Sequence, residues 1–162
     1  MIIGKQELNS EERVLMTELL VATRNAKKLK EIRELLEGLK LKITSLDDYR
    51  DMPDIEEDGK TFAQNAIKKA ATISLYTGKL VIGEDSGLQV KALKNAPGVY
   101  SARFSGPLAT DKKNNTRLLK VLKDVPLKKR QARYRCFVAL TDKKRIVGIV
   151  SVTCAVLIDY RQ

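Results

Sequence analysis

A strand–helix–strand pattern near the start of the chain constrains the fold more than any other feature of this sequence. Residues 19–23 form a short apolar run that ends in small and polar side chains, as a buried strand does. Asn25 can cap the helix that follows, in which apolar residues recur at helical spacing until Gly38, and residues 41–45 read as a second strand. Because strands joined through a helix pair in parallel with a right-handed crossover, the pattern predicts an α/β protein.

The rest of the chain adds helices and strands without any repeat, linker or low-complexity stretch. We therefore expect residues 1–162 to form a single domain with a mixed central sheet and flanking helices, in which residues 1–17 are an N-terminal extension. The predicted elements are helices over 61–77 and 111–122, a strand over 80–83 that residues 88–93 extend or double back from, and long strands over 132–141 and 146–158.

Composition limits the chemistry that this chain can support. It contains no histidine, which excludes histidine-based catalysis and histidine metal ligands, so any metal is expected to be a hard, oxygen-bound cation. Both cysteines, Cys136 and Cys154, lie in apolar runs typical of strands, and we expect two buried thiols in a reducing compartment. Because the sequence has no apolar run of about 18 residues and no signal-peptide pattern, it predicts a cytoplasmic protein.

The net charge of +11 falls mostly on residues 106–162, where lysines and arginines gather in short clusters near predicted turns and helix ends. Such a basic region suits a solvated surface, an anionic small molecule or a nucleic acid. Aromatic residues do not interleave with the basic ones, and no nucleic-acid-binding motif is present. A nucleic-acid partner is therefore the weakest of the three interpretations, and no membrane partner is expected.

Residues 23–28, Thr-Arg-Asn-Ala-Lys-Lys, lie at the predicted strand-to-helix junction. A helix N-terminus offers unpaired backbone N–H groups and a partial positive charge, so small polar side chains and lysines at that place suit a phosphate. The stretch contains no glycine and is not a Walker A loop. The alternative interpretation is an ordinary asparagine cap followed by solvated lysines.

Two acidic stretches are candidates for a metal site. Glu57 belongs to a Glu-Glu-Asp-Gly stretch ahead of a predicted helix that carries Lys69, and its carboxylate either caps the helix or binds a cation. Glu84 and Asp85 leave a buried strand at its carboxyl end, where ligands of α/β sheets bind, and an extended backbone points them to opposite sides. One carboxylate can then face a metal while the other orients a water; the alternative is a simple charged turn.

A turn-rich stretch over residues 95–106 carries small residues that let the backbone approach a ligand closely. Its arginine, Arg103, can bind a phosphate or pair with a carboxylate, or it can hold the loop in place. This stretch is the last of four candidate stretches that follow one another along the chain.

Taken together and in this order, these stretches resemble the Ham1/ITPase family, the pyrophosphatases of non-standard purine nucleoside triphosphates. The resemblance runs from about residue 20 to about residue 158, and five motifs in register make it specific. The motifs are Thr23-x-Asn25-x-x-Lys28, then Glu57-x-Gly59-x-Thr61-Phe62 continuing into Asn65-Ala66 and Lys69-Ala70, then Asp85-Ser86-Gly87-Leu88, Pro97-Gly98-x-x-Ser101-Ala102-Arg103, and Ala109-Thr110-Asp111-x-x-Asn114.

The resemblance implies an elongated, two-lobed α/β fold, a homodimer, and Mg²⁺-dependent hydrolysis of ITP, dITP and XTP to the monophosphate and pyrophosphate. It implies that residues 23–28 hold the triphosphate, that Glu57 and Asp85 bind Mg²⁺, and that Asp85 also activates the attacking water. The candidate substrate-binding residues are Thr23, Arg24, Asn25, Ala26, Lys27, Lys28, Lys69, Ser86 and Arg103.

Two departures from the family pattern limit what the resemblance implies. The family usually has an aspartate where this chain has Glu84, so Glu84 is kept only as an additional candidate metal ligand. The family also continues into a Gly-Phe-Gly-Tyr-Asp-Pro segment, a lysine and a Ser-His-Arg element that hold the purine base, whereas this chain stops at Gln162. We therefore expect an incomplete second lobe, and the alternative to an active enzyme is a truncated, catalytically impaired homologue that acts as a binding or structural protein or is an aberrant gene product.

Overall fold

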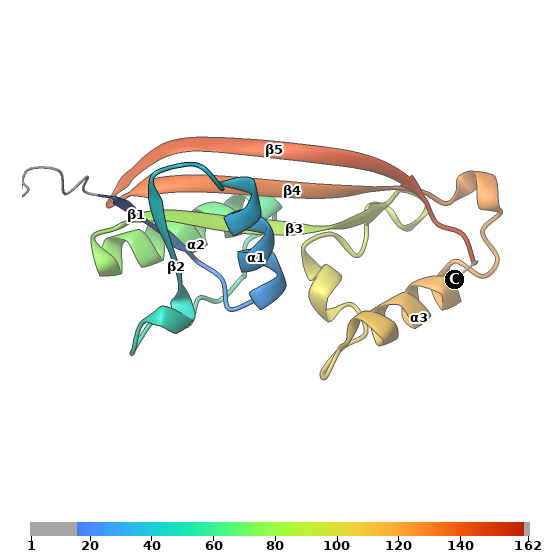
Figure 1. The fold of residues 1–162 in the computed structure, drawn as a ribbon. Coiled ribbons are helices and arrows are strands. Elements are labelled where there is room, and N and C mark those ends of the chain that lie inside the picture. Colours follow the sequence, from blue (N-terminus) through green and yellow to red (C-terminus); the bar gives the residue numbers. More distant parts are fainter. Residues whose placement is uncertain (1–15, 161–162) are drawn as a thin grey trace, which may run out of the picture.

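A computed structural model describes residues 16–160, so residues 1–15 of the expected N-terminal extension lie outside it. Its centre is a mixed sheet with the strand order β2-β1-β3-β4-β5 (Figure 1). None of the helices between residues 16 and 160 is long and apolar enough to cross a bilayer. The elements are β1 (Thr17–Val21), α1 (Ala26–Leu35), β2 (Leu41–Ser45), α2 (Phe62–Thr77), β3 (Leu80–Val90), α3 (Asp111–Val121), β4 (Gln131–Asp142) and β5 (Arg145–Leu157).

The first two strands form the parallel pair that the sequence predicts, with α1 as the crossover. β1 pairs with β2 from Thr17 to Val21, and with β3 on its other side, where Leu19 to Val21 lie opposite Leu80 to Ile82. β3 continues well past the end of β1, and beyond Ile82 no described strand pairs with that edge. The acidic residues of β3 lie on this open part of the strand.

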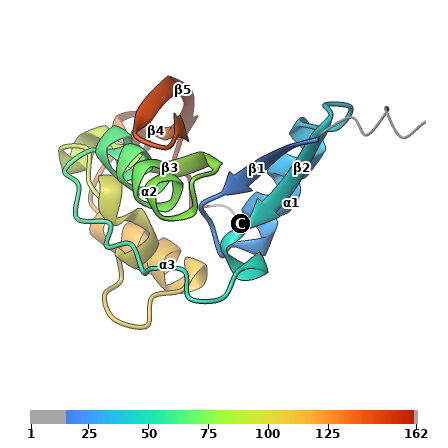
Figure 2. The same ribbon diagram turned by 90° about the vertical axis from the view of Figure 1, so that its left-hand side faces the viewer.

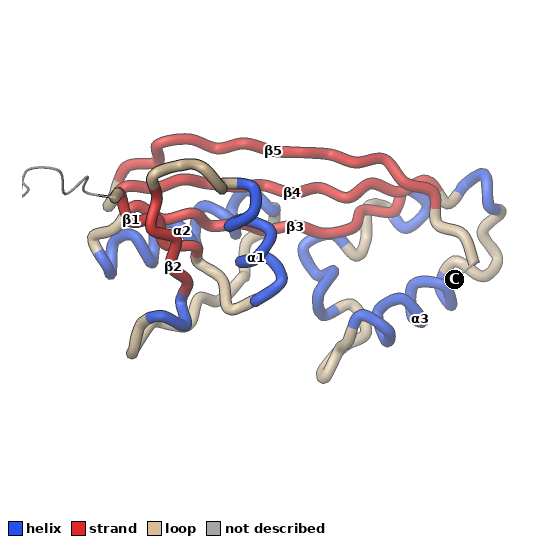
Figure 3. Tube along the Cα trace, viewed as in Figure 1, coloured by secondary structure: helices blue, strands red, loops and turns tan. Residues whose placement is uncertain are grey.

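The long strands β3, β4 and β5 run along most of the molecule, with α1 and α2 beside one half of them and α3 toward the other end (Figure 3). β3 and β4 pair in antiparallel fashion along the full length of β3, and β4 and β5 form an antiparallel hairpin. The sequence left open whether residues 88–93 extend the strand or double back. In the structure β3 extends as far as Val90, and residues 91–93 then form one helical turn.

Hydrophobic side chains form two separate clusters, one toward each end of the long strands. The first lies between α2, β1 and the first half of β3, and the second between α3, the end of β3 and the start of β4. Two cores joined by continuous strands produce the elongated, two-lobed form that the sequence resemblance implies. The buried members are Leu20, Ala22, Leu46, Ala66, Ala70, Ile73, Val81 and Ala139 in the first cluster, and Leu88, Val90, Leu118, Leu122 and Ala132 in the second.

α2 packs directly on β3 because the strand has no side chain where the two backbones meet. A Cβ placed on Gly83 would lie 2.3 Å from the carbonyl oxygen of Ala66 and 2.6 Å from the amide nitrogen of Ala70. Viewed at 90°, α2 and α1 lie on opposite sides of β1 and β3 (Figure 2). Side chains that alternate along β3 therefore face α2 or α1 in turn.

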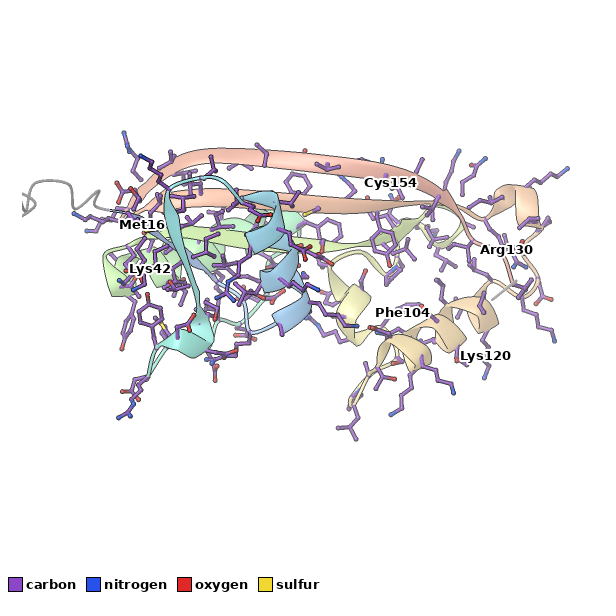
Figure 4. The ribbon with its side chains drawn as sticks, in the orientation of Figure 1. Met16, Lys42, Phe104, Lys120, Arg130 and Cys154 are labelled. Atoms are coloured by element: carbon purple, nitrogen blue, oxygen red, sulfur yellow. The ribbon has the colours of Figure 1, made fainter. Side chains whose placement is uncertain are left out.

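The prediction of two buried thiols is wrong for Cys154. Both cysteines are free, as expected, but Cys136 on β4 is half-buried and Cys154 on β5 is exposed. β5 lies at the edge of the sheet, and all of its residues except Val156, which packs against the second hydrophobic cluster, are exposed (Figure 4). An apolar run alone could not distinguish such an edge strand from a buried one.

Candidate active site

A pocket of about 340 Å³ opens beyond the carboxyl ends of β1 and β2. Three of the candidate stretches, which are far apart in sequence, meet there because the two parallel strands end at the same edge of the sheet and β3 runs past them. The lining residues are Ala22, Thr23, Arg24, Asn25 and Lys28 after β1, Leu46 after β2, Pro53, Asp54, Ile55 and Glu57 from residues 49–60, the acidic loop that precedes α2, and finally Lys69 from α2 and Glu84 from β3.

The turn from β1 into α1 is held by its own side chains. Thr23 Oγ1 accepts a hydrogen bond from the Asn25 amide at 3.1 Å, and Asn25 Oδ1 accepts from the amides of Lys27 and Lys28 at 3.0 and 3.2 Å. The expected asparagine cap is confirmed. However, the cap takes up two of the helix amides that the sequence offered to a phosphate, so a ligand here would rely more on side chains and on the helix dipole.

Lys28 and Glu84 form an ion pair across 56 residues of sequence. The Lys28 ammonium also donates to Ser86 Oγ at 3.5 Å, and the Cys136 thiol donates to the second carboxylate oxygen, Oε1 of Glu84, at 3.5 Å. Burial raises the pKa of the Glu84 carboxyl, but the hydrogen bonds from Lys28 and Ser86 outweigh it, and the pKa lies below its ordinary value. Glu84 is therefore a charged side chain with both oxygens engaged.

Glu57 and Lys69 form the second ion pair of the pocket, at 2.8 Å. The Lys69 ammonium also donates to the main-chain oxygen of Glu84 at 2.9 Å, so it links the acidic loop to the open edge of β3. Arg103 does not line the pocket; its guanidinium donates to the main-chain oxygen of Glu57 at 3.0 Å and lies over the ring of Tyr100. Of the interpretations for Arg103, the geometry favours holding a loop in place.

Asp85 faces the opposite side of β3 from Glu84, toward α2, and is 6% exposed. Its Oδ2 accepts from the Asn65 amide at 2.9 Å. Burial raises the pKa of Asp85, and the negative charges of Glu57 and Glu84 raise it further. The Asn65 hydrogen bond and the positive charge of Lys69 lower it, but the net result is a pKa above the ordinary value. Asp85 thus lies just behind the pocket wall, close enough to Glu57 and Glu84 for their charges to raise its pKa.

The remaining candidates lie at the rim or outside the pocket. Arg24 lines it and pairs with Asp47 and Asp54 at 3.6 Å each, all with exposed side chains. Ala26 and Lys27 are exposed on the first turn of α1 and are not among the lining residues.

The carboxylates fit a small hard cation. Between residues 16 and 160 there is no group of three or more His, Cys, Asp or Glu arranged to hold a metal. Mg²⁺ does not need one, because it takes one or two carboxylates and fills its remaining positions with water and phosphate oxygens. Burial and the nearby Glu84 raise the pKa of Cys136 to about 11, which makes it a poor metal ligand. Glu57 and Asp85 offer two oxygen donors whose mutual repulsion a cation would relieve.

Two residues of the site carry no role in the sequence prediction, Asn65 and Cys136. Asn65 is fully buried on α2, where its Oδ1 accepts from the Gly59 amide at 2.8 Å while its Nδ2 holds Asp85. The sequence did contain a signal for Asn65: it lies on the apolar face of the predicted helix, and a buried polar side chain needs a hydrogen-bond partner. Cys136 had no such signal, because its contact with Glu84 depends on the register in which β4 pairs with β3.

The fold and the site define an α/β protein with a charged pocket beyond the carboxyl ends of parallel strands. The chain belongs to the Ham1 family, whose profile matches residues 19–158. Among solved structures it is similar to a HAM1 protein from Coxiella burnetii, with a TM-score of 0.77 and 36% identity over 86% of this chain and 71% of that one. The Ham1 protein of Staphylococcus aureus gives a TM-score of 0.79 and 29% identity, covering 88% and 72% of the two chains.

Several curated relatives carry the name dITP/XTP pyrophosphatase, among them proteins from two bacteria that match most of this chain. The protein of Geobacter sulfurreducens is 52% identical over 125 residues, which are 77% of this chain and 63% of the relative. The protein of Desulforamulus reducens is 44% identical over 136 residues, 84% of this chain and 68% of the relative. The chain thus spans roughly two thirds of the length of these relatives.

Proposed function

We propose that this chain carries the triphosphate-binding and metal-binding part of a pyrophosphatase that hydrolyses ITP, dITP and XTP to the monophosphate and pyrophosphate. The observation that carries the proposal is the meeting of residues 23–28, Glu57, Lys69 and Glu84 around one pocket, with Asp85 directly behind it. The names of the relatives from Geobacter and Desulforamulus support the same reaction.

The two lysines and the first turn of α1 would bind the triphosphate. Lys28 from α1 and Lys69 from α2 both line the pocket, and Thr23 and Asn25 add small polar groups to its lining. Hydrolysis at a phosphorus needs charge neutralisation and positioning above all, because the developing charge is spread over phosphate oxygens. Two lysines that line the same pocket supply both.

Glu57 and Asp85 would hold Mg²⁺, which when bound supplies further neutralisation of the phosphates. Asp85 would take the proton of a water whose oxygen bonds to the α-phosphorus. The bond from that phosphorus to the oxygen bridging to the β-phosphate would break, and pyrophosphate would leave with that oxygen. The raised pKa of Asp85 suits a proton acceptor, since a more basic carboxylate accepts a proton more readily. Asn65 would keep the Asp85 carboxylate in a fixed orientation.

Pyrophosphate release from ITP, dITP, XTP and ATP in the presence of Mg²⁺ tests this proposal. We expect release from the first three to exceed release from ATP, and Asp85→Asn to lower kcat by at least about 100-fold, a typical size for a lost general base. Glu57→Gln should raise the Mg²⁺ concentration needed for half-maximal rate. The matched control is Asp58→Asn, which changes an acidic neighbour that pairs with Lys68 at 2.6 Å outside the pocket.

Equal release from wild type and Asp85→Asn would remove the proposed role of Asp85. No release from any of the four nucleotides, by a chain that gives the far-ultraviolet spectrum of a folded α/β protein, would favour the catalytically impaired homologue instead.

A further inference from the structure

Every cationic side chain that lines the pocket already has an acidic partner within the described chain. Lys28 pairs with Glu84, Lys69 pairs with Glu57, and Arg24 pairs with two exposed aspartates. The pocket therefore presents no unpaired positive charge, although the chain as a whole carries a net charge of +11. Asp85, which is 6% exposed, adds a third carboxyl group behind the wall, next to those of Glu57 and Glu84.

This balance weakens the attraction that the pocket exerts on a bare anion. A polyphosphate that approaches meets lysines whose fields are largely cancelled by carboxylates at contact distance. It can recruit a lysine only if the ion pair opens and leaves a carboxylate beside the incoming phosphate. A divalent cation that arrives with the polyphosphate removes this obstacle, because it adds two positive charges next to the same carboxylates.

Of the two lysine pairs, Lys28–Glu84 is the better restrained. The Glu84 side chain is 14% exposed, and its second oxygen is held by the Cys136 thiol from β4. The Lys28 backbone is fixed by the Asn25 cap, so both ends of the pair are anchored to separate elements. In contrast, Glu57 lies on a loop and its side chain is 36% exposed.

We propose that Glu84 is a specificity-determining residue: by pairing with Lys28 it suppresses binding of a bare polyphosphate, and so makes polyphosphate binding depend on a divalent cation. The inference rests on the proposed function in that it takes a polyphosphate as the ligand of this pocket. It assigns Glu84 a role through Lys28 and leaves the cation itself to Glu57 and Asp85.

Calorimetric titration with inorganic tripolyphosphate, once with EDTA and once with Mg²⁺, tests the inference without turnover. Wild type should bind at least about tenfold more tightly with Mg²⁺, equivalent to about 1.4 kcal/mol. Glu84→Gln should raise the Mg²⁺-free affinity about fivefold, the upper range for releasing a partly exposed ion pair. In the Lys28→Met background the same substitution should change it less than about twofold, because the lysine that would be released is gone.

The matched control is Glu34→Gln, which removes the glutamate of a surface pair between Lys30 and Glu34 on α1 and should leave both affinities unchanged. If Glu84→Gln does not fold, Glu84→Asp keeps the charge but shortens the arm, and it should raise the Mg²⁺-free affinity by a smaller factor. An unchanged or lowered Mg²⁺-free affinity in the folded Glu84 variants, or a gain that persists with Lys28→Met, overturns the inference.

The test separates this inference from the proposed function. A wild-type chain that binds tripolyphosphate equally with EDTA and with Mg²⁺ overturns the role of Glu84 and leaves the proposed function standing. A chain that binds in neither solution and releases no pyrophosphate overturns the proposed function itself.

Discussion

The side-chain amide of Asn65 joins the catalytic candidate Asp85 to the acidic loop. Its Nδ2 donates to Asp85 Oδ2 at 2.9 Å, and its Oδ1 accepts from the Gly59 amide at 2.8 Å. Both groups of one buried amide are therefore satisfied, one by the strand and one by the loop that carries Glu57. The amide couples the position of the two proposed metal ligands through a single side chain.

Asn65→Ala should destabilise the protein and impair the reaction together. The substitution leaves a buried carboxylate oxygen and a loop amide without partners, which costs about 1–3 kcal/mol of unfolding free energy. We expect kcat to fall at least about tenfold, because Asp85 loses its fixed orientation. Urea unfolding and pyrophosphate release measure the two effects. Asn115→Ala, at an exposed asparagine of α3, is the control and should change neither. Wild-type kcat in Asn65→Ala would show that Asp85 needs no such support.

Gly83→Ala should lower the free energy of unfolding by about 1–3 kcal/mol, the usual range for forcing extra atoms into a packed core. The added methyl group would collide with the backbone of α2 at Ala66 and Ala70, which cannot move aside as a flexible side chain can. The matched control is Gly148→Ala on β5, where an added Cβ meets no atom within 4 Å. Equal midpoints of chemical denaturation for the two variants would contradict the direct packing of α2 on β3.

Glu18 lies at the end of β1 that is far from the site. We expect it to make the free energy of unfolding depend on pH. Hydrogen bonds from Lys79 and Tyr49 lower the pKa of its carboxyl from 4.5 to about 2. A lowered folded-state pKa stabilises the fold above the unfolded value and loses that contribution as the pH falls through the folded one. Glu18→Gln should therefore cost about 1 kcal/mol at pH 7, a size suited to a partly exposed pair, and the cost should shrink below about pH 4.5 and vanish near pH 2.

Urea unfolding of wild type and Glu18→Gln at a series of pH values measures this prediction. Glu34→Gln serves as the control, because its pair with Lys30 is longer, at 3.7 Å, and lies on an exposed helix face. A difference between wild type and Glu18→Gln that stays constant from pH 7 to pH 2 would rule out the proposed linkage.

The outer edge of β5 should drive self-association of this chain. No described strand pairs with that edge, and residues 146–157 contain no charge. Val152 is 66% exposed, and edge strands without charges pair readily with other chains. Val152→Lys should slow concentration-dependent light scattering severalfold and change stability by less than about 1 kcal/mol. Val121→Lys adds the same charge at an exposed site on α3 and should leave the scattering rate unchanged.

Local features could be predicted because they depend on neighbours in sequence. The helix expected over 61–77 is found at Phe62–Thr77, capped by Thr61 and ended by Gly78 in the left-handed conformation. The cap by Asn25 is likewise set by hydrogen bonds that reach only two and three residues ahead. The exposure of Cys154 could not be predicted in the same way, since it depends on which strand lies at the edge of the sheet.

The sequence by itself determined the order of strands and helices, the family to which the chain belongs, and the stretches that could meet in a site. Periodicity, caps and motifs act over a few residues, so they can be read without coordinates. Only the tertiary structure decided what those side chains face. Lys28 pairs with a carboxylate 56 residues away because β3 runs on where β1 ends, and the register of β4 then brings Cys136 to the same carboxylate. Contacts of that kind depend on strand register and crossover, which no local pattern encodes.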